Sequence, residues 1–391
     1  MNTLTFSNIE TAFAGKSTID LKKARLLFKT MSKPGLVKAG NVLLNIALKL
    51  CLPVKWAIKP TIYKYFVGGE NILDCDSTVE KLSKYKVKSI LDYSVEGKES
   101  DNEIESAFKE TRKSIDNAAK NPNIPFAVFK PTAFGKSEIL MKASEGKVLN
   151  TEEEKELVKF KNRIDVLCKT AWENDIPVLI DAEDSWFQDV FDIVIHEMMQ
   201  KYNKKRAIVY NTLQMYRWDR LDFLKKNYQK AKEGNYFYGA KFVRGAYMEK
   251  ERERAIELGY NDPIQPDKES TDRDFNAALK FSVEHIDRIS IFNGTHNEYS
   301  SMYLTKLMEK HEVAKNDSRI FFSQLYGMSD NISFNLAAHG FNVAKYVPYG
   351  PVRNVMPYLI RRAEENTSVK GQTGRELSLI LQEVKRRKVK K

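Results

Sequence analysis

From residue 86 onward, short apolar runs rich in Val, Ile, Phe and Tyr recur along the chain, and almost every run ends in a polar residue. Segments with helical spacing of apolar residues lie between them and predict helices over 102–120, 153–174, 185–202 and 215–234. Apolar strands that alternate with amphipathic helices are typical of a parallel sheet covered on both faces. The predicted strands span 87–94, 125–132, 177–184, 206–214, 237–245, 290–296, 319–327 and 343–350.

The number of strand–helix units predicts an α/β fold of the (β/α)8, TIM-like barrel type. Eight units over roughly 300 residues match such a barrel with insertions. A doubly wound open sheet is the alternative. We favour the barrel because polar groups end nearly every strand, and barrel active sites gather at those ends. The predicted organisation is an N-terminal helical segment over 1–85, a catalytic barrel over 86–382 and a basic tail over 383–391.

The N-terminal segment is expected to be mostly helical. Asp20 is predicted to cap a helix over 21–32 that keeps helical spacing of its apolar residues. The stretch 36–69 is apolar and basic, and two prolines interrupt it. It predicts either a pair of helices packed on the main domain or a segment that lies on a membrane surface, where Trp, Tyr and snorkelling Lys side chains are favoured.

A short apolar strand over 343–347 leads through a Pro- and Gly-containing turn into a predicted helix near the C-terminus. Pro357 suits the first turn of that helix. Arg361 and Arg362 are adjacent, so their side chains point about 100° apart and can hold one small anion between them. Glu365 lies within reach of both guanidinium groups. The alternative interpretation is a pair of solvated surface arginines.

The net charge of the chain indicates which classes of partner are favoured. The chain has 64 Lys and Arg against 52 Asp and Glu, a net charge of +12. This favours nucleic acid, an anionic substrate or an anionic membrane as partner. No basic module with interleaved aromatic residues accompanies the tail, so we do not expect nucleic-acid binding. Three cysteines without a CxxC pair indicate a reducing compartment. No secretory signal or membrane-spanning run is visible, so we expect a cytoplasmic protein, peripheral on the inner membrane.

The polar side chains at the predicted strand ends indicate a polar cavity that is lined by both acidic and basic residues. Lys130 and Asp181 could form a buried ion pair, since a buried charge needs a partner. Any one of these side chains alone could be a solvated loop residue, but so many at one barrel mouth favour a functional site. The set is Asp92, Lys130, Asp181, Glu183, Gln214, Lys241, Arg244, His296, Gln324 and Tyr346.

Other chemistries find little support in the sequence. There is no GxGxxG, no GxSxG and no HExxH, and the five histidines show no metal-ligand spacing. The tripeptide GKS occurs at 15–17 and 135–137, but neither copy has the first glycine of a P-loop. We therefore expect neither a Rossmann nucleotide site nor a metal centre.

Several segments in order, from about Pro125 to Thr373, resemble the proline dehydrogenase family, with its single-function, eukaryotic-like branch as the nearest match. The most specific are VRGAY and PYLIRRAEEN, supported by LIDAEDSWFQ, YNTLQMY, GTHNEYS and KYVPYGPVRN. The resemblance implies an FAD-dependent oxidoreductase that oxidises L-proline to 1-pyrroline-5-carboxylate, the first step of proline catabolism. It also implies hydride transfer from proline C5 to flavin N5, and a membrane quinone as electron acceptor.

The resemblance also implies roles for single residues. Arg361 and Arg362 match the two arginines that hold the substrate carboxylate in the family. They lie on a C-terminal, substrate-clamping helix that follows the barrel. Lys130 and Asp181 match residues near proline, and these four, with Lys241, are the candidate catalytic residues. Tyr247 and Tyr346 match aromatic walls of the substrate site. The residues implied for FAD are Gln214, Lys241, Val243, Arg244, Gly245, Ala246, Thr271, Thr295, His296, Asn297 and Glu365.

The same residues show one departure from the family pattern and leave three competing interpretations open. Fused bacterial members of the family have Arg where Lys241 stands and Lys where Arg244 stands. The resemblance implies that position 241 faces the flavin N5, where Lys offers a charge without a fork. A hydroxyproline-oxidising relative commonly has a smaller residue at the position of Tyr346, so Tyr346 favours proline. The second competing function is a flavin-free barrel lyase acting on an anionic substrate, and the third is a non-catalytic, basic membrane adaptor.

Overall fold

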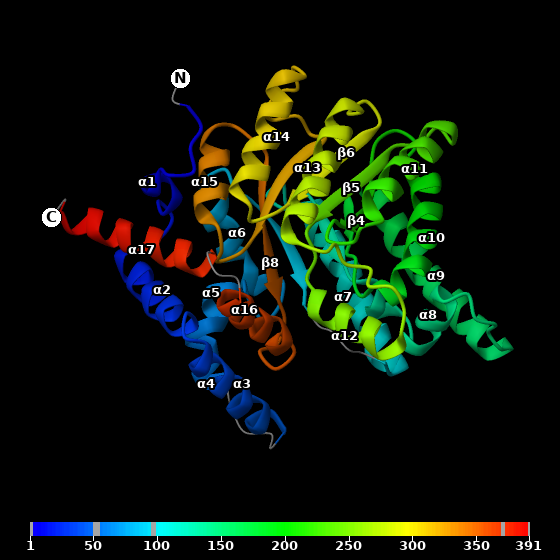
Figure 1. Ribbon diagram of the computed structural model, residues 1–391, viewed down its shortest axis with the longest axis horizontal. Helices are drawn as coiled ribbons and strands as arrows, with labels where there is room; N and C mark the ends of the chain where they lie inside the picture. The colour runs from blue at the N-terminus through cyan, green and yellow to red at the C-terminus, as the bar shows by residue number, and fades with distance from the viewer. Residues whose placement is uncertain (1–2, 50–54, 95–98, 369–371, 390–391) are drawn as a thin grey trace. The chain divides into compact units, whose positions relative to one another are not determined.

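The computed structural model describes residues 3–49, 55–94, 99–368 and 372–389 (Figure 1). The chain divides into two compact units. The first unit comprises Met1–Glu96 and Gln324–Lys391, and the second comprises Gly97–Ser323.

Eight strands form one sheet, in the order β1-β8-β7-β6-β5-β4-β3-β2. The first strand pairs in parallel with the last, from Lys88 opposite Ala344 to Tyr93 opposite Tyr349. Parallel pairing of the first and last strands is the topology of a (β/α)8 barrel, so the predicted fold is confirmed. The strands are β1 (Lys88–Tyr93), β2 (Ala127–Phe129), β3 (Val178–Ile180), β4 (Val209–Gln214), β5 (Tyr238–Val243), β6 (Ile289–Gly294), β7 (Ile320–Leu325) and β8 (Val343–Tyr349).

Helices of the second unit follow its strands in alternation (Figure 1). Their starts are fixed by side-chain caps: Asn150 and Glu153 form a capping box at the start of α9, and Asn297 caps α14. The elements between strands are α7 (Asp101–Lys120), η3 (Pro131–Phe134), α8 (Ser137–Ser144), α9 (Thr151–Glu173), α10 (Ser185–Tyr202), α11 (Arg220–Glu233), α12 (Met248–Leu258), α13 (Lys268–Glu284) and α14 (Glu298–Lys310).

The first unit adds many helices to β1 and β8. Our prediction that Asp20 caps the first long helix is wrong. Ser17 is the N-cap and Asp20 closes a capping box, in which each side chain accepts from the other's backbone N–H at 3.1 Å. The elements are α1 (Ile9–Ala12), α2 (Thr18–Met31), α3 (Pro34–Lys49), α4 (Lys55–Ile58), η1 (Lys59–Tyr63), α5 (Lys64–Phe66), η2 (Leu73–Cys75), α6 (Asp76–Ser83), α15 (Asp330–Ala338), α16 (Met356–Ser368) and α17 (Gln372–Val389).

The last helix, α17, lies beside α2 (Figure 1). The segment that we predicted as a basic tail is helical as far as Val389. Arg386 and Arg387 both donate to the buried carboxylate of Glu383, at 2.7 and 2.6 Å. Arg387 also donates to the backbone oxygen of Phe13 at 3.0 Å. The bond to Phe13 ties Arg387 to the C-terminal end of α1.

The stretch 36–69 contains α3, α4, η1 and α5. In the part of the chain that the structure describes, no helix is both long and apolar enough to cross a membrane. Tyr63 is buried and donates to the backbone oxygen of Gly350 at 2.8 Å, as a packed helix requires. Trp56, in contrast, is 77% exposed. Contact of this stretch with a membrane surface stays a prediction.

Candidate active site

The candidate site residues fall in both units, and each unit positions its own set. In the second unit, Lys241 of β5 and Asp181, which directly follows β3, form an ion pair. Lys241 is 5% exposed, and its Nζ donates to Oδ1 of Asp181 at 2.5 Å. A buried ammonium is stable only with such a partner. The ion pair that the structure gives for Asp181 is therefore with Lys241, and the predicted pair of Lys130 and Asp181 stays a prediction.

A second chain of hydrogen bonds links the ends of β2, β3 and β4. The side-chain amide of Gln214 donates to the backbone oxygen of Glu183 at 2.7 Å. The carboxylate of Glu183 accepts from the backbone N–H and the hydroxyl of Thr132, at 3.0 and 2.6 Å. Gln214 and Glu183 are both buried. These bonds fix the polar ends of three neighbouring strands with respect to one another.

The turn after β5 requires glycine at position 245. Gly245 has φ of +131°, and a Cβ atom there would lie 2.5 Å from the ring of Tyr216. The β4–β5 ladder continues into this turn, because Tyr216 donates from its N–H to the backbone oxygen of Arg244 at 2.7 Å. Gly245 and Ala246 are exposed. The turn therefore presents accessible backbone at the carboxyl end of a central strand.

Arg244 connects this turn to α13 and α14. Its guanidinium donates to Asp272 at 2.8 Å, to the hydroxyl of Thr295 at 2.6 Å and to the hydroxyl of Ser300 at 3.0 Å. Burial lowers the pKa of Arg244, and the carboxylate of Asp272 opposes that shift. Thr295 in turn accepts from the backbone N–H of Asn297 at 3.1 Å. Arg244 thus holds in place two residues that the resemblance implies for FAD.

The remaining candidates of the second unit lie at the ends of its elements. Lys130 directly follows β2 and is half-buried, and Tyr247 precedes α12. Thr271 is buried in the first turn of α13, where its hydroxyl donates to the backbone oxygen of Asp267 at 3.2 Å. His296 follows β6 and is half-buried.

In the first unit, the arginine pair lies on α16 as predicted. Pro357 falls in the first turn, and Tyr358 and Leu359 are buried. Arg362 is 6% exposed, and its guanidinium lies 5.2 Å from the centre of the Tyr358 ring. Arg361 is half-buried. A solvated surface pair is therefore the wrong interpretation for Arg362.

Two further candidates complete the first unit's set. Tyr346 is buried on β8, opposite Ile90 of β1, and its backbone oxygen accepts from Tyr326 at 2.8 Å. Glu365 lies on α16, but its side chain is outside the described part of the chain.

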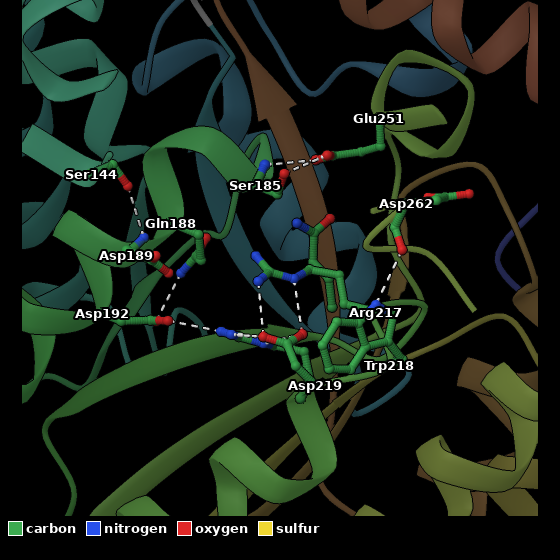
Figure 2. Close-up of polar contacts among 12 residues, drawn as sticks. Ser144, Ser185, Gln188, Asp189, Asp192, Arg217, Trp218, Asp219, Glu251 and Asp262 are labelled. Carbon is green, nitrogen blue, oxygen red and sulfur yellow. Dashed lines mark hydrogen bonds and ion pairs between the residues drawn. The ribbon is translucent and has the colours of Figure 1, made fainter. Parts of the chain in front are cut away.

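A buried carboxylate on α12 was missed by the sequence analysis. Glu251 is fully buried, and it accepts from the backbone N–H and the hydroxyl of Ser185, at 2.6 and 2.5 Å (Figure 2). Burial raises the pKa of Glu251. Lys250 adds an ion pair with Asp184 at 2.7 Å. Two adjacent residues of α12 thus hold the N-terminus of α10, although the segment MEKERERA has the pattern of an ordinary solvated helix.

A second buried network shapes the loop after β4 (Figure 2). Asp219 accepts from both Arg217 and Arg220, and Arg220 also pairs with Asp192 at 2.8 Å. Burial disfavours the Asp219 carboxylate, but the two arginines outweigh it and lower its pKa. The predicted helix over 215–234 consequently starts only at Arg220, because the preceding residues form this ionic turn.

Comparison with known proteins places these features in a family. The family model described as proline dehydrogenase matches residues 75–375. Proline dehydrogenase 1, mitochondrial, from Dictyostelium discoideum is 32% identical over 96% of this chain and 74% of its own. CarD, a carbapenem antibiotics biosynthesis protein of Pectobacterium carotovorum, is 33% identical over 83% of this chain and 84% of its own. Hydroxyproline dehydrogenase from Xenopus laevis is 30% identical over 96% of this chain and 88% of its own.

Solved structures agree with the fold. Proline utilization A from Bdellovibrio bacteriovorus, inactivated by N-propargylglycine, matches with a TM-score of 0.71 at 20% identity. The match covers 93% of this chain and 37% of that one. The chain thus spans a little over a third of that protein, and the likeness concerns the barrel architecture.

Proposed function

The chain belongs to the proline dehydrogenase family, and from this we propose that it oxidises L-proline to 1-pyrroline-5-carboxylate with bound FAD. The observation that carries the proposal is the buried pair of Lys241 and Asp181 at the strand ends of a barrel. The pair supplies a fixed cation at the place where the family implies the flavin ring.

The described residues fit a flavin by the chemistry of their donors. The turn at Gly245 and Ala246 offers exposed backbone, kept open by a residue with no side chain. Lys241, on the strand that leads into this turn, offers a fixed positive charge, and Thr295 with Asn297 offers polar groups at the start of α14. When bound, FAD accepts the hydride removed from the substrate carbon and so supplies the redox chemistry. The residues proposed to hold it are Gln214, Lys241, Val243, Gly245, Ala246, Thr271, Thr295, His296, Asn297 and Glu365, with Arg244 positioning Thr295 and the start of α14.

For the substrate, we assign the carboxylate to Arg361 and Arg362. Charge-assisted bonds from guanidinium to carboxylate are strong and directional, and two adjacent forks can hold one anion from two sides. Arg362 is held against the Tyr358 ring, which limits the directions in which its fork can point. The other substrate residues are Lys130, Asp181, Tyr247 and Tyr346, and the aromatic pair is proposed to exclude water from the reacting ring.

Hydroxyproline is the second candidate substrate, since a relative of similar identity carries that name. The bulk of the buried Tyr346 favours the unsubstituted ring. Tyr346→Ser should open a small polar space and reduce the preference for proline over 4-hydroxyproline. An unchanged ratio of kcat/KM values would assign the discrimination to another residue.

The electron acceptor proposed is a membrane quinone, reached by peripheral contact of the stretch 36–69 with the bilayer. Trp56 is exposed there, and the net charge of +12 favours an anionic surface. We propose a cytoplasmic location on the inner membrane for a bacterial source; several curated relatives are named as mitochondrial. Binding to anionic vesicles that weakens as salt rises supports this contact, whereas equal binding to neutral vesicles contradicts it.

Turnover with product trapping tests the proposed reaction. Purified protein is incubated with L-proline and an artificial electron acceptor, and 1-pyrroline-5-carboxylate is captured as its coloured adduct with 2-aminobenzaldehyde. We expect adduct to form only with both proline and acceptor present. Adduct formation without any acceptor, or none after addition of FAD, would contradict the proposal. A barrel lyase would form its product independently of acceptor and flavin.

A further inference from the structure

A cavity of about 540 Å³ lies within the first unit, bordered by α2, η1, α5, α6 and α15. Its volume is in the usual range for small-molecule sites, roughly 300–1,000 Å³. None of the residues that line it is among those proposed for proline or FAD. The cavity is therefore separate from the residues proposed for proline and FAD. Pro60, Thr61, Lys64 and Tyr65 of its lining belong to the stretch 36–69 that we propose for membrane contact.

Most of the cavity wall is apolar or aromatic. Leu27 and Leu82 line it with the rings of Tyr85 and Phe334, whose centres are 5.6 Å apart. The hydroxyl of Tyr85 donates to the backbone oxygen of Ala14 at 3.0 Å. Its polar group is therefore already hydrogen-bonded, and its aromatic ring contributes apolar surface to the cavity wall. Leu26 of α2 also lines the cavity and is 69% exposed. A hydrocarbon chain is the kind of ligand that such a wall stabilises.

The buried charged side chains of the lining are already paired with one another or with a neighbouring buried lysine. Lys16 pairs with Asp330 at 2.9 Å and donates to the hydroxyl of Tyr65 at 2.9 Å. Asp330 pairs also with Lys345 at 2.9 Å. Burial opposes ionisation of Asp330, but the two lysines outweigh it and lower its pKa to about 2. Asp330 therefore stays ionised and bound, and it does not attract a cation into the cavity.

The exposed part of the lining is positively charged. Lys23 of α2, Lys64 of α5 and Lys81 of α6 are exposed and line the cavity. Among the residues that the structure describes, none of the three has a carboxylate within ion-pair distance. Asp20 is the acidic residue beside them, and four lysines against two aspartates line the cavity in all. This excess of cations favours an anionic head group over a cationic or neutral one.

We propose that this cavity binds a single-chain amphiphile with an anionic head group, such as a long-chain fatty acid. The chain packs against the apolar wall, and the head group lies among Lys23, Lys64 and Lys81. Inorganic phosphate could pair with the lysines but would not pack against the apolar wall. An uncharged hydrocarbon could pack against the wall but would leave the lysines without an anion. Neither ligand therefore matches both parts of the lining. The ligand enters as a monomer from solution.

The test measures binding of a fluorescent fatty acid, 11-(dansylamino)undecanoic acid, to the full-length protein below the micellar concentration. We expect saturable binding at one site per chain. Palmitate should displace the probe, whereas dodecyltrimethylammonium, which has a similar chain and a cationic head, and inorganic phosphate should not. Non-saturable binding, or equal displacement by the cationic detergent, would overturn the proposal.

Variants locate the site. Leu27→Trp fills the cavity and should abolish saturable binding. The triple variant Lys23→Gln, Lys64→Gln, Lys81→Gln should weaken it about tenfold, which corresponds to about 1.4 kcal/mol. Lys29→Gln is the matched control, because Lys29 is exposed on α2 but does not line the cavity. Thermal melting checks the fold of each variant, and a well-folded triple variant that binds as the wild type does would contradict the assignment.

A last comparison separates the two sources of such a ligand. Anionic phosphatidylglycerol vesicles offer the same chemistry within a bilayer. Displacement of the probe by monomeric palmitate at concentrations where vesicles have no effect supports a soluble ligand. Displacement by vesicles alone would overturn that part of the proposal. None of these readouts depends on proline turnover, so they do not stand or fall with the proposed function.

Discussion

Lys241 of β5 and Asp181 at the end of β3 form a buried ion pair with a distance of 2.5 Å between Nζ and Oδ1. The strand that separates them in the sheet, β4, pairs with both β3 and β5. The pair therefore bridges across one strand at the carboxyl end of the sheet. It links a residue implied for the substrate to one implied for the flavin.

Removing one charge of this pair should be costly. Asp181→Asn leaves a buried ammonium without its counter-charge, and breaking such a pair costs about 3–5 kcal/mol. We expect a reduced free energy of unfolding by urea denaturation, together with a fall in turnover. The control is Asp175→Asn, which breaks the exposed pair with Arg206 and should cost less than about 1 kcal/mol. Equal effects of the two substitutions would mean that burial does not strengthen the Lys241–Asp181 pair.

The turn after β5 predicts a specific effect on flavin content. Gly245→Ala places a Cβ atom 2.5 Å from the Tyr216 ring at a φ of +131°. The turn must shift, so we expect purified variant protein to carry much less FAD, measured as the ratio of visible to ultraviolet absorbance. Gly259→Ala is the control, because Gly259 also has positive φ but nothing within 4 Å of its Cβ position. It should cost about 1 kcal/mol of stability and retain its flavin. Full flavin content in Gly245→Ala would contradict the assignment of this turn to the FAD site.

The arginine pair predicts an effect on substrate affinity alone. Truncating one partner of a desolvated charge pair costs roughly 2–5 kcal/mol, or about 30-fold to several thousandfold in affinity. Arg361→Met and Arg362→Met should each raise the KM for proline by such factors while FAD content stays near that of the wild type. Lysine at either position should restore affinity only in part, because it lacks the fork.

The control for the arginine pair is Lys385→Met, which removes an exposed charge on α17. It should leave the KM for proline unchanged. A change below about threefold in both arginine variants would mean that the carboxylate is held elsewhere, with Lys130 the next residue to test.

Glu251 predicts a pH dependence of stability. Its pKa is raised in the folded protein, mainly by burial. A carboxyl group with a raised folded-state pKa stabilises the fold below its unfolded pKa of about 4.3, and this contribution is lost as pH rises through the folded-state value. Glu251→Gln cannot titrate, so the stability of wild type relative to this variant should fall as pH rises from about 4 through that value. Thermal melts of both proteins across this range measure the difference.

Glu251→Ala provides the complementary measurement. It removes the acceptor for the Ser185 backbone N–H at the start of α10 and should cost about 1–3 kcal/mol at low pH, where Glu251 is protonated. This cost should shrink as pH rises, in parallel with the difference measured for Glu251→Gln. If the stability difference between wild type and Glu251→Gln does not vary with pH, Glu251 has the same pKa in the folded and unfolded protein. That result would contradict the raised pKa.

The strands and the helix that carries Arg361 and Arg362 could be predicted because their signals are local. Each apolar run fills a buried strand whatever its neighbours are, and Pro357 with the apolar spacing around it fixes the start of α16. The pairing of side chains is not local. Lys130, Asp181 and Lys241 were all recognised at strand ends, but which of them meet depends on the tilt and register of β3, β4 and β5.

Three other features were missed for related reasons. Glu251 stands in a highly charged helix, where a sequence pattern cannot separate the one buried carboxylate from its solvated neighbours. Ser17 and Asp20 are both good capping residues, and only the backbone geometry shows that Ser17 is the cap and Asp20 the third residue of the capping box. The cavity beside α2 depends on side chains from several distant segments and has no local signature.

The visible spectrum of the purified protein under anaerobic conditions tests the central claim most directly. Protein loaded with FAD should show oxidised flavin absorbance that bleaches when L-proline is added, with one flavin reduced per proline oxidised. The Arg361→Met variant should need much more proline for the same bleaching. A protein that takes up no FAD, or whose flavin stays oxidised at saturating proline, would contradict the assignment of this chain as a proline-oxidising flavoenzyme.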